Sequence, residues 1–289
     1  MNLTVQGRTL SRAHLEQIRQ MISSHPGWSR RKLSLALCEQ WDWRNGAGQW
    51  KDMASRTLLV KLHDRGLIQL PERRQIPPNR MRRQPAPVPS PEEAPIQCAL
   101  AELGTLIVTE VSRDPALRSE LAAYLQLHHY LGYAGPVGQN LQYAVRDSNG
   151  RLLACMVFGA AAWKCQARDE FIGWTLEQRG RQLHRVVNNS RFLILPWVVV
   201  PHLASCILGT IARRLRRDWQ AKYGHDIDLL ETFVEQGRFQ GTAYRAANWI
   251  KAGQTTGRTR QDQHRQIQVP RKDVYLYPLH LKFRARLCA

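Results

Sequence analysis

The sequence predicts an α+β protein with two folded parts. Helical patterns fill residues 1–70, a proline- and arginine-rich stretch occupies residues 71–95, and strand-like apolar runs alternate with helical patterns over residues 96–289. A chain of 289 residues, 43% of them hydrophobic, can bury one large core and a smaller one. The formal net charge of +19 is spread along the chain. It favours a polyanionic partner, with nucleic acid ahead of an anionic membrane, and a merely basic soluble protein is the alternative.

The apolar spacing of the N-terminal part predicts three short helices. Ser11 and Ser29 are suited to cap the first two, and the third runs over residues 53–65 and ends at Gly66. The third helix has leucines on one face and basic residues on the other, and the module ends with the pattern Leu-x-x-Leu-x-x-x-Gly-Leu-Ile-x-Leu-Pro at residues 59–71. It resembles a helix-turn-helix of the winged type, in which a basic third helix can enter the major groove of DNA. The alternative is a helical module for dimerisation or packing. If the module binds DNA, the expected phosphate contacts are Arg30, Arg31, Lys32, Arg56 and Lys61.

A linker separates the two parts. Residues 71–95 hold eight of the fifteen prolines and five arginines, with almost nothing apolar to bury. This composition predicts an extended or disordered connector and sets the domain boundary. Its arginines either follow phosphates or are simply solvated.

Residues 96–289 show the alternation of a mixed sheet with covering helices. The strongest local signal is Asn149-Gly150, a turn dipeptide between two apolar runs, which predicts a hairpin. Around it we expect a helix over residues 115–127, a strand over 192–200, a basic helix over 204–223, and strands over 229–234 and 274–277. This order of helix, hairpin, strand, helix and strand matches the N-acetyltransferase (GNAT) fold.

The six cysteines show neither a C-x-x-C pair nor the spacing of a structural zinc site. We therefore expect reduced, mostly buried thiols and no metal site. The N-terminus has no apolar signal region, and no segment reaches the roughly 18 to 20 apolar residues that span a bilayer. The sequence thus predicts a cytoplasmic protein with no membrane partner.

Three segments of the second part resemble a known family. They are His128-His-Tyr-Leu-Gly-Tyr, Glu231-Thr-Phe-Val and Gly241-Thr-Ala-Tyr-Arg-Ala-Ala-Asn-Trp. They are similar to the DruA family of the Druantia anti-phage defence systems, and the resemblance covers nearly the whole chain. The third segment is also similar to the Gly-Thr-x-Tyr-Gln-Ala-Ser-Asn ending of the phage Mom proteins, which are GNAT-like and attach a glycinamide-derived group to adenine. The resemblance implies a GNAT-like domain that handles DNA, within a defence system or a mobile element.

The sequence does not identify a cofactor. Acetyl-CoA enzymes of this fold place a glycine-rich loop at the start of the helix after their fourth strand, where backbone amides bind pyrophosphate. This chain has Pro201-His-Leu-Ala-Ser-Cys-Ile-Leu-Gly209 there, with a single, late glycine. The departure counts against acetyl-CoA, and the sequence identifies no other cofactor.

Group transfer to a base amine requires a group that moves a proton, donors for a developing oxyanion, and a pocket with aromatic surface. For catalytic roles we expect His129, Tyr130, Glu231, Tyr244 and Asn248. Each has a structural alternative: a carboxylate that starts a strand often accepts structural hydrogen bonds, tandem histidines often end a helix in solvent, and an aromatic can be core. Asn248 is the hardest to explain by packing, because a buried amide needs partners.

Nucleic-acid contacts in the second part are expected from a polar group before the strand at 192–200 and from a basic loop. Residues 245–272 contain a single acid, Asp262, among seven basic residues, and a solvated loop is the alternative. The expected binding residues are Asn188, Asn189, Ser190, Arg191, Arg238, Thr242, Arg245, Trp249, Lys251, Arg258 and Arg260.

Three functions compete. The first is a DNA-binding enzyme that acts on nucleic acid through its GNAT-like domain, and the second is a non-catalytic DNA-recognition subunit. The third is a metal-dependent nuclease or transposase, which ranks lower because no clear two-metal constellation is visible. The acids that it would recruit are Asp169, Glu170, Asp226, Asp228 and Glu231. The expected partners are DNA and other proteins of defence or transposition.

Overall fold

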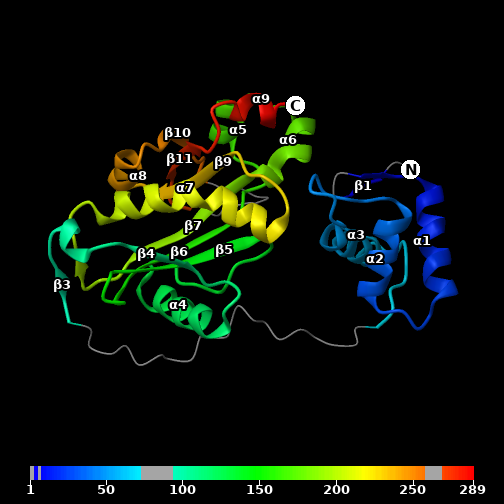
Figure 1. Ribbon diagram of the computed structural model, residues 1–289. Helices are drawn as coiled ribbons and strands as arrows, with labels where there is room; N and C mark the ends of the chain where they lie inside the picture. Colours follow the sequence, from blue (N-terminus) through cyan, green and yellow to red (C-terminus); the bar gives the residue numbers. More distant parts are fainter. Residues whose placement is uncertain (1–2, 6–7, 73–93, 258–268) are drawn as a thin grey trace. The chain divides into compact units, whose positions relative to one another are not determined.

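The computed structural model describes residues 3–5, 8–72, 94–257 and 269–289 (Figure 1). The chain divides into two compact units, residues 1–79 and 80–289. Most of the predicted linker lies outside the described residues. Among the helices that are described, none combines the length and the apolar character needed to cross a bilayer.

The first unit packs three helices around a small core. Its elements are β1 (Leu3–Val5), β2 (Arg8–Leu10), α1 (Arg12–Ser24), α2 (Arg30–Gln40) and α3 (Asp52–Asp64). Ser11 and Ser29 cap α1 and α2 as predicted, each accepting from the backbone N–H of the third residue of its helix. The paired strands β1 and β2 precede α1, and residues 65–72 after α3 contain no strand. The wing of a winged helix therefore stays a prediction.

The second unit contains a seven-stranded mixed sheet with helices on both faces. Its elements in order are β3 (Ile96–Gln97), β4 (Ile107–Glu110), α4 (Pro115–His128), β5 (Asn140–Arg146), β6 (Leu152–Ala160), α5 (Gln166–Ile172), α6 (Leu176–Gln182), β7 (Val186–Ile194), β8 (Val198–Val199), α7 (Leu203–Tyr223), β9 (Leu229–Glu235), α8 (Thr242–Ala246), β10 (Ile250–Gln254), β11 (Lys272–Pro278) and α9 (Phe283–Leu287). The mixed α+β class is confirmed.

The strand order in the large sheet is β10-β11-β9-β7-β6-β5-β4. All neighbours are antiparallel except β7 and β9, which are parallel and are joined through α7. Helix α7 covers one face of the sheet and α4 lies against the other (Figure 1). The Tyr143 hydroxyl donates to Asp218 at 2.9 Å and so ties β5 to α7.

The hairpin and the basic helix were predicted correctly, but two segments differ from the prediction. The strand expected over residues 192–200 begins six residues earlier, at Val186, and ends at Ile194 because Pro196 cannot donate to a ladder. The basic loop expected over residues 245–272 begins in the last turn of α8, and its residues 250–254 form strand β10, which pairs with β11 at the edge of the sheet. Residues 258–268 of this stretch lie outside the described residues. The residues from Asn188 to Arg191 therefore lie inside a strand rather than before one.

Candidate functional site

Strands β7 and β9 separate from each other halfway along the sheet. They pair at three positions, the last of which joins Asn188 to Glu231. Beyond it a bulge interrupts β7: Asn189 lies opposite Phe158 and Arg191 opposite Val157, so Ser190 is the extra residue. A bulge bends the strand that carries it and increases its twist. The second halves of β7 and β9 consequently leave an opening within the sheet.

A cavity of about 540 Å³ lies at this opening, within the range of small-molecule sites. Its walls come from the end of α4, from β7 and β9, from the first turn of α7, and from the segment between β9 and α8. Of the predicted residues it brings together His129, Tyr130, Asn189, Ser190, Arg238, Thr242 and Tyr244. The prediction missed the apolar part of the wall, Leu131, Phe192, Ile194 and Phe239 among others. No sequence signal distinguished these residues from ordinary core.

Tyr244 is fixed in the cavity wall by Asn189. Its hydroxyl donates to Asn189 Oδ1 at 2.7 Å, and the Asn189 amide donates to the carbonyls of Val157 at 3.2 Å and Arg191 at 3.0 Å. The Thr232 hydroxyl donates to the Asn189 carbonyl at 3.0 Å. Burial raises the pKa of Tyr244 to about 12. Tyr244 is therefore a neutral phenol at physiological pH, held in one orientation.

The local sequence explains this position of Tyr244. Gly241 has a φ of +67°, and a Cβ on it would lie 2.3 Å from the Tyr275 hydroxyl oxygen. Glycine alone allows both this backbone conformation and this close approach. Helix α8 begins directly after it, and the Tyr244 ring stacks on Tyr275 with centroids 5.9 Å apart. The Gly-Thr-x-Tyr motif is thus a device that seats the tyrosine.

His129 faces the same cavity as a neutral imidazole. Its Nδ1 lies 3.2 Å from the Leu131 backbone N–H and accepts from it, which assigns the ring proton to Nε2. Burial, together with the charges of Arg191 and Arg238, lowers the pKa of His129 to about 4. The ring stacks on Tyr130 with centroids 5.0 Å apart. His129 can donate a hydrogen bond, but it is a weak base.

The cavity is electropositive. Arg238 lines it, and its guanidinium lies over the Tyr130 ring, 4.6 Å from the ring centroid. Arg191 is not a lining residue; it follows the lining residue Ser190 and donates to the carbonyls of Gly132 at 2.8 Å and Ser190 at 2.7 Å. Neither arginine forms an ion pair with a carboxylate in the part of the chain that is described, and none of the described lining residues is acidic. Uncompensated positive charge beside aromatic surface suits an anionic ligand with a planar or apolar body.

Glu231 points away from the cavity. Its carboxylate is fully buried, accepts from the Arg168 guanidinium at 2.9 Å and from the Ala162 backbone N–H at 2.8 Å, and lies on the α5 side of the sheet. Arg168 is equally buried and also bonds Asp169 at 2.7 Å. This is the structural alternative named above: the carboxylate holds a buried arginine.

Asn248 is exposed, which corrects the expectation that it is a buried amide. It follows α8 with a φ of +62°, and asparagine tolerates this left-handed conformation better than most residues. Trp249 is buried and packs on Tyr244, with ring centroids 5.1 Å apart. Lys251 on β10 pairs with Asp273 at 2.7 Å.

The remaining predicted residues lie outside the cavity. Asn188 lies opposite Glu231 of β9 and does not line the cavity, and Arg245 is exposed on α8 next to Thr242. Arg258 and Arg260 fall outside the described residues. In the first unit, Arg31, Lys32 and Lys61 are exposed, whereas Arg30 donates to the Pro71 carbonyl at 2.7 Å and Arg56 pairs with Asp52.

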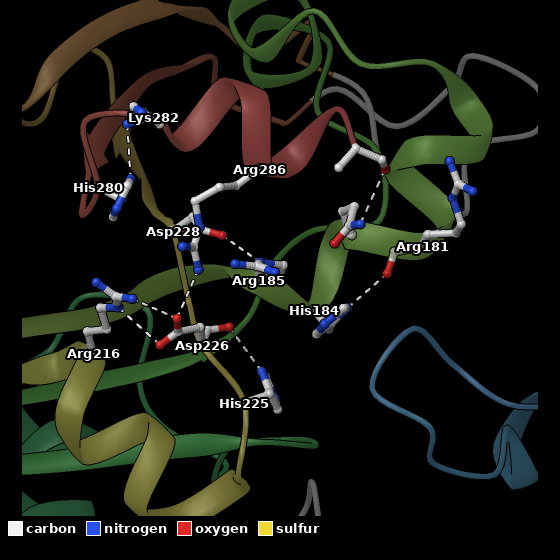
Figure 2. Close-up of polar contacts among 12 residues, drawn as sticks. Arg181, His184, Arg185, Arg216, His225, Asp226, Asp228, His280, Lys282 and Arg286 are labelled. Carbon is white, nitrogen blue, oxygen red and sulfur yellow. Dashed lines mark hydrogen bonds and ion pairs between the residues drawn. The ribbon is translucent and has the colours of Figure 1, made fainter.

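Four of the five acids considered for a metal-dependent reaction are bonded to arginines, and Figure 2 shows two of them, Asp226 and Asp228. The fifth, Glu170, is exposed and accepts from Gln166. Asp226 accepts from Arg216 at 3.0 and 2.6 Å and from Arg286 at 2.9 Å, and these guanidinium groups, Arg216 first, hold the pKa of Asp226 below its usual range. Asp228 is buried between Arg185 and Arg286. The described residues contain no group of three or more His, Cys, Asp or Glu arranged to hold a metal ion.

Comparison with known proteins connects the chain to one family. A family model described as Druantia protein DruA matches residues 64–278. No curated protein matches the chain in sequence.

Among solved structures, the chain is similar to a spermidine N-acetyltransferase from Vibrio cholerae in complex with CoA and spermine, at 8% identity over 60% of this chain and 95% of that one, with a TM-score of 0.40. It is also similar to a putative phosphinothricin N-acetyltransferase, at 13% identity over 61% and 99%, with a TM-score of 0.40. A third is a putative acyl-CoA N-acyltransferase from Klebsiella pneumoniae, at 14% identity over 61% and 99%, with a TM-score of 0.37.

Proposed function

Because this chain belongs to the DruA family of Druantia anti-phage proteins, we propose that it acts on nucleic acid as a GNAT-like transferase. It binds DNA through its basic surface and transfers a group to it in the cavity between β7 and β9. The observation that carries the proposal is the composition of that cavity: an arginine without an acidic partner, Arg238, a fixed phenol and a neutral imidazole on an aromatic and apolar wall, with Arg191 next to it.

Each of these groups has a chemical use in transfer to an amine. The neutral His129 ring carries its proton on Nε2, and this N–H donates a hydrogen bond to a developing oxyanion. Tyr244 and Thr232 present hydroxyl oxygens in fixed positions, which orient the amine or the donor group. Arg191 and Arg238 attract the anionic partner of the reaction, which is the DNA backbone in this proposal.

Mass spectrometry of nucleosides tests the proposal. DNA from cells that express the protein should contain one nucleoside of increased mass, and the Tyr244→Phe variant should lose it while the DNA affinity stays the same. Tyr277→Phe is the matched control, because this β11 tyrosine lies against Trp249 and outside the cavity wall. If the nucleosides are unchanged although the protein binds DNA tightly, transfer to DNA is rejected.

A second function, a non-catalytic DNA-recognition subunit, is favoured by one observation. A pKa of about 4 makes His129 a poor proton acceptor at neutral pH, and no described lining residue is a carboxylate. The cavity would then recognise a ligand without changing it. The nucleoside experiment separates the two functions, because the recognition subunit leaves every nucleoside unmodified.

DNA binding itself is tested by its dependence on salt. Contacts with phosphates release counterions, so the affinity should fall steeply as the salt concentration rises. Arg31→Ala and Lys61→Ala, which change exposed residues of the first unit, should each reduce the slope of log K against log salt by about one. A slope near zero for the wild-type protein would contradict the electrostatic argument.

A further inference from the structure

Three side chains form a rim at the cavity that we call the aromatic rim: Tyr130, Arg238 and Phe239. The Tyr130 and Phe239 rings meet edge to face, with centroids 5.1 Å apart and planes at 61°. The Arg238 guanidinium lies 4.6 Å from the Tyr130 centroid and 5.7 Å from that of Phe239. Tyr130 follows α4 and the other two follow β9, so two distant segments of the chain build one rim.

The aromatic rim has unused binding capacity. Phe239 keeps 47% of its surface exposed, although it is a large apolar side chain on a basic protein. Within the described part of the chain, the guanidinium of Arg238 contacts ring faces but forms no ion pair or side-chain hydrogen bond. A planar cation has five N–H donors, and its natural bidentate partners are carboxylates and phosphates.

A second aromatic–arginine pair in the same unit shows what a satisfied arrangement looks like. Arg179 lies 5.3 Å from the Trp163 ring centroid, and Trp163 is 52% exposed. There, however, the guanidinium is neutralised by Asp169 at 3.0 Å. The geometry of ring and cation is alike at the two places, and the carboxylate is what differs. An anion completes the aromatic rim in the way that Asp169 completes the other pair.

The ligand must therefore carry a negative charge next to a flat apolar surface. A nucleotide has both, since its base stacks on aromatic rings and its phosphate accepts from arginine. An acidic peptide would bring charge without a planar group for the exposed Phe239, and an anionic lipid would bring a chain rather than a plane. The 540 Å³ cavity behind the rim gives one base room to enter.

We propose that the aromatic rim holds a single unstacked nucleotide of a DNA strand, with its base against Tyr130 and Phe239 and its phosphate on Arg238. This rests on the proposed action on nucleic acid and adds the state of the substrate: a strand whose target base has left the stack, either single-stranded or extruded from a duplex. Tyr130, Arg238 and Phe239 are binding residues, and the chemistry belongs to the wall behind them.

Photocrosslinking and affinity measurements on the full chain test the inference. A single-stranded oligonucleotide that carries one 5-iododeoxyuridine should crosslink to Tyr130 or Phe239 when irradiated. By fluorescence anisotropy with a labelled single strand, Tyr130→Ala and Phe239→Ala should each weaken binding by roughly 5- to 150-fold, the effect of one lost base stack. Tyr130→Phe should bind like the wild type, because the ring and not the hydroxyl makes the contact.

The control is Trp163→Ala, an exposed aromatic beside an arginine that already has its carboxylate, and it should leave the affinity unchanged. Arg238→Ala should weaken binding and reduce the salt slope by about one. Thermal unfolding of every variant shows whether it is folded; for Arg238→Ala and Phe239→Ala we expect the wild-type midpoint, since both side chains are exposed.

The outcomes separate the inference from the proposed function. If the rim variants bind the strand as tightly as the wild type and the salt slope stays steep, the aromatic rim is not the nucleotide site, but DNA binding stands. If the wild type binds no DNA, both fail. If the rim variants lose affinity for a free nucleoside diphosphate but not for the strand, the site takes a soluble nucleotide and the inference is overturned.

Discussion

Glu231 and Thr232 are neighbours in β9, and their side chains serve opposite sides of the sheet. On the α5 side, Glu231 is sealed with Arg168, and every charge in that cluster has a counter-charge within 3.0 Å. On the other side, Thr232 borders a cavity lined by Arg238, which has no acidic partner among the described residues, and the charge of Arg191 lies close to the lining residue His129. Two adjacent residues of one strand therefore face different environments. We call the side on which the charges of the Glu231 cluster are paired the closed side, and the side with the cavity the open side.

The difference teaches how to distinguish structural charge from functional charge in this protein. A buried ion pair is expensive to desolvate, so both members must be present and well oriented for the fold to tolerate them. A charge without a counter-charge is tolerated beside a cavity, because water or an ionic ligand there can solvate or neutralise it. The first kind should affect stability when changed, and the second kind should affect binding.

The largest effect is expected for Glu231→Gln. The substitution keeps the size of the side chain and leaves the buried Arg168 guanidinium without its main counter-charge, which destabilises a fold by roughly 3 to 5 kcal/mol. Urea unfolding of the full chain measures the loss. Glu170→Gln is the control: it changes an exposed acid that bonds Gln166, and the free energy of unfolding should hardly move.

Replacing both partners sharpens this test. Glu231→Leu combined with Arg168→Met removes the charges together and should recover most of the stability, because no buried charge remains unpaired. A Glu231→Gln protein with wild-type stability and no activity would instead make Glu231 a catalytic residue and break the comparison between the two sides.

The next effect concerns the open side, where a cavity requires a rigid wall. Gly241→Ala puts a Cβ 2.3 Å from the Tyr275 hydroxyl oxygen and strains a positive φ. The control Gly237→Ala has a φ of +81° with nothing within 4 Å, so it should lose only the backbone part, roughly 1 to 2 kcal/mol. Gly241→Ala should lose roughly 1 to 3 kcal/mol more. Equal losses would mean that Tyr275 moves aside freely.

Local signals in the sequence were sufficient for most elements. Serine caps, the Asn149-Gly150 turn and the apolar periods depend on residues a few positions apart, and they placed α1, α2, the β5–β6 hairpin and α7. The same holds for Tyr244, whose motif contains its own glycine. The wing after α3 stays a prediction. Nucleic-acid binding by the basic loop was inferred from its charge alone and also stays a prediction.

Long-range pairings could not be predicted. The cavity exists because β7 and β9 pair at three positions and then separate at the Ser190 bulge, and register is not visible in either strand by itself. The partner of Glu231 is 63 residues away, on a helix where Arg168 looks like an ordinary surface arginine. Asn248 did carry a signal, because asparagine is enriched at positive φ, and it was misread as a buried amide.

A smaller effect is expected for Tyr244→Phe. The variant keeps the ring against Tyr275 but removes the donor to Asn189 Oδ1, leaving a buried acceptor unsatisfied. We expect a loss of roughly 1 to 2 kcal/mol in unfolding free energy, and Tyr277→Phe should lose less. If Tyr244→Phe lowers the free energy of unfolding by several kcal/mol, its effect on any activity reflects a loss of folding rather than a change in the site.

The smallest effect is a dependence on pH that the open side should show through His129. The folded protein holds the pKa of His129 at about 4, below its ordinary value of 6.5. Between these two pH values His129 is protonated in the unfolded chain and neutral in the folded one. Its contribution to the free energy of unfolding is therefore fully present above pH 6.5 and is lost as the pH falls toward 4. The midpoint of urea unfolding, measured from pH 7 to pH 4, should therefore fall less in His129→Gln than in the wild type.

The pH profile of Arg238→Ala should lie between those two, since the substitution removes one of the two charges that lower the pKa of His129. Identical pH profiles for all three proteins would show that the cavity does not hold His129 in its neutral form, and the open side would lose its hydrogen-bond donor.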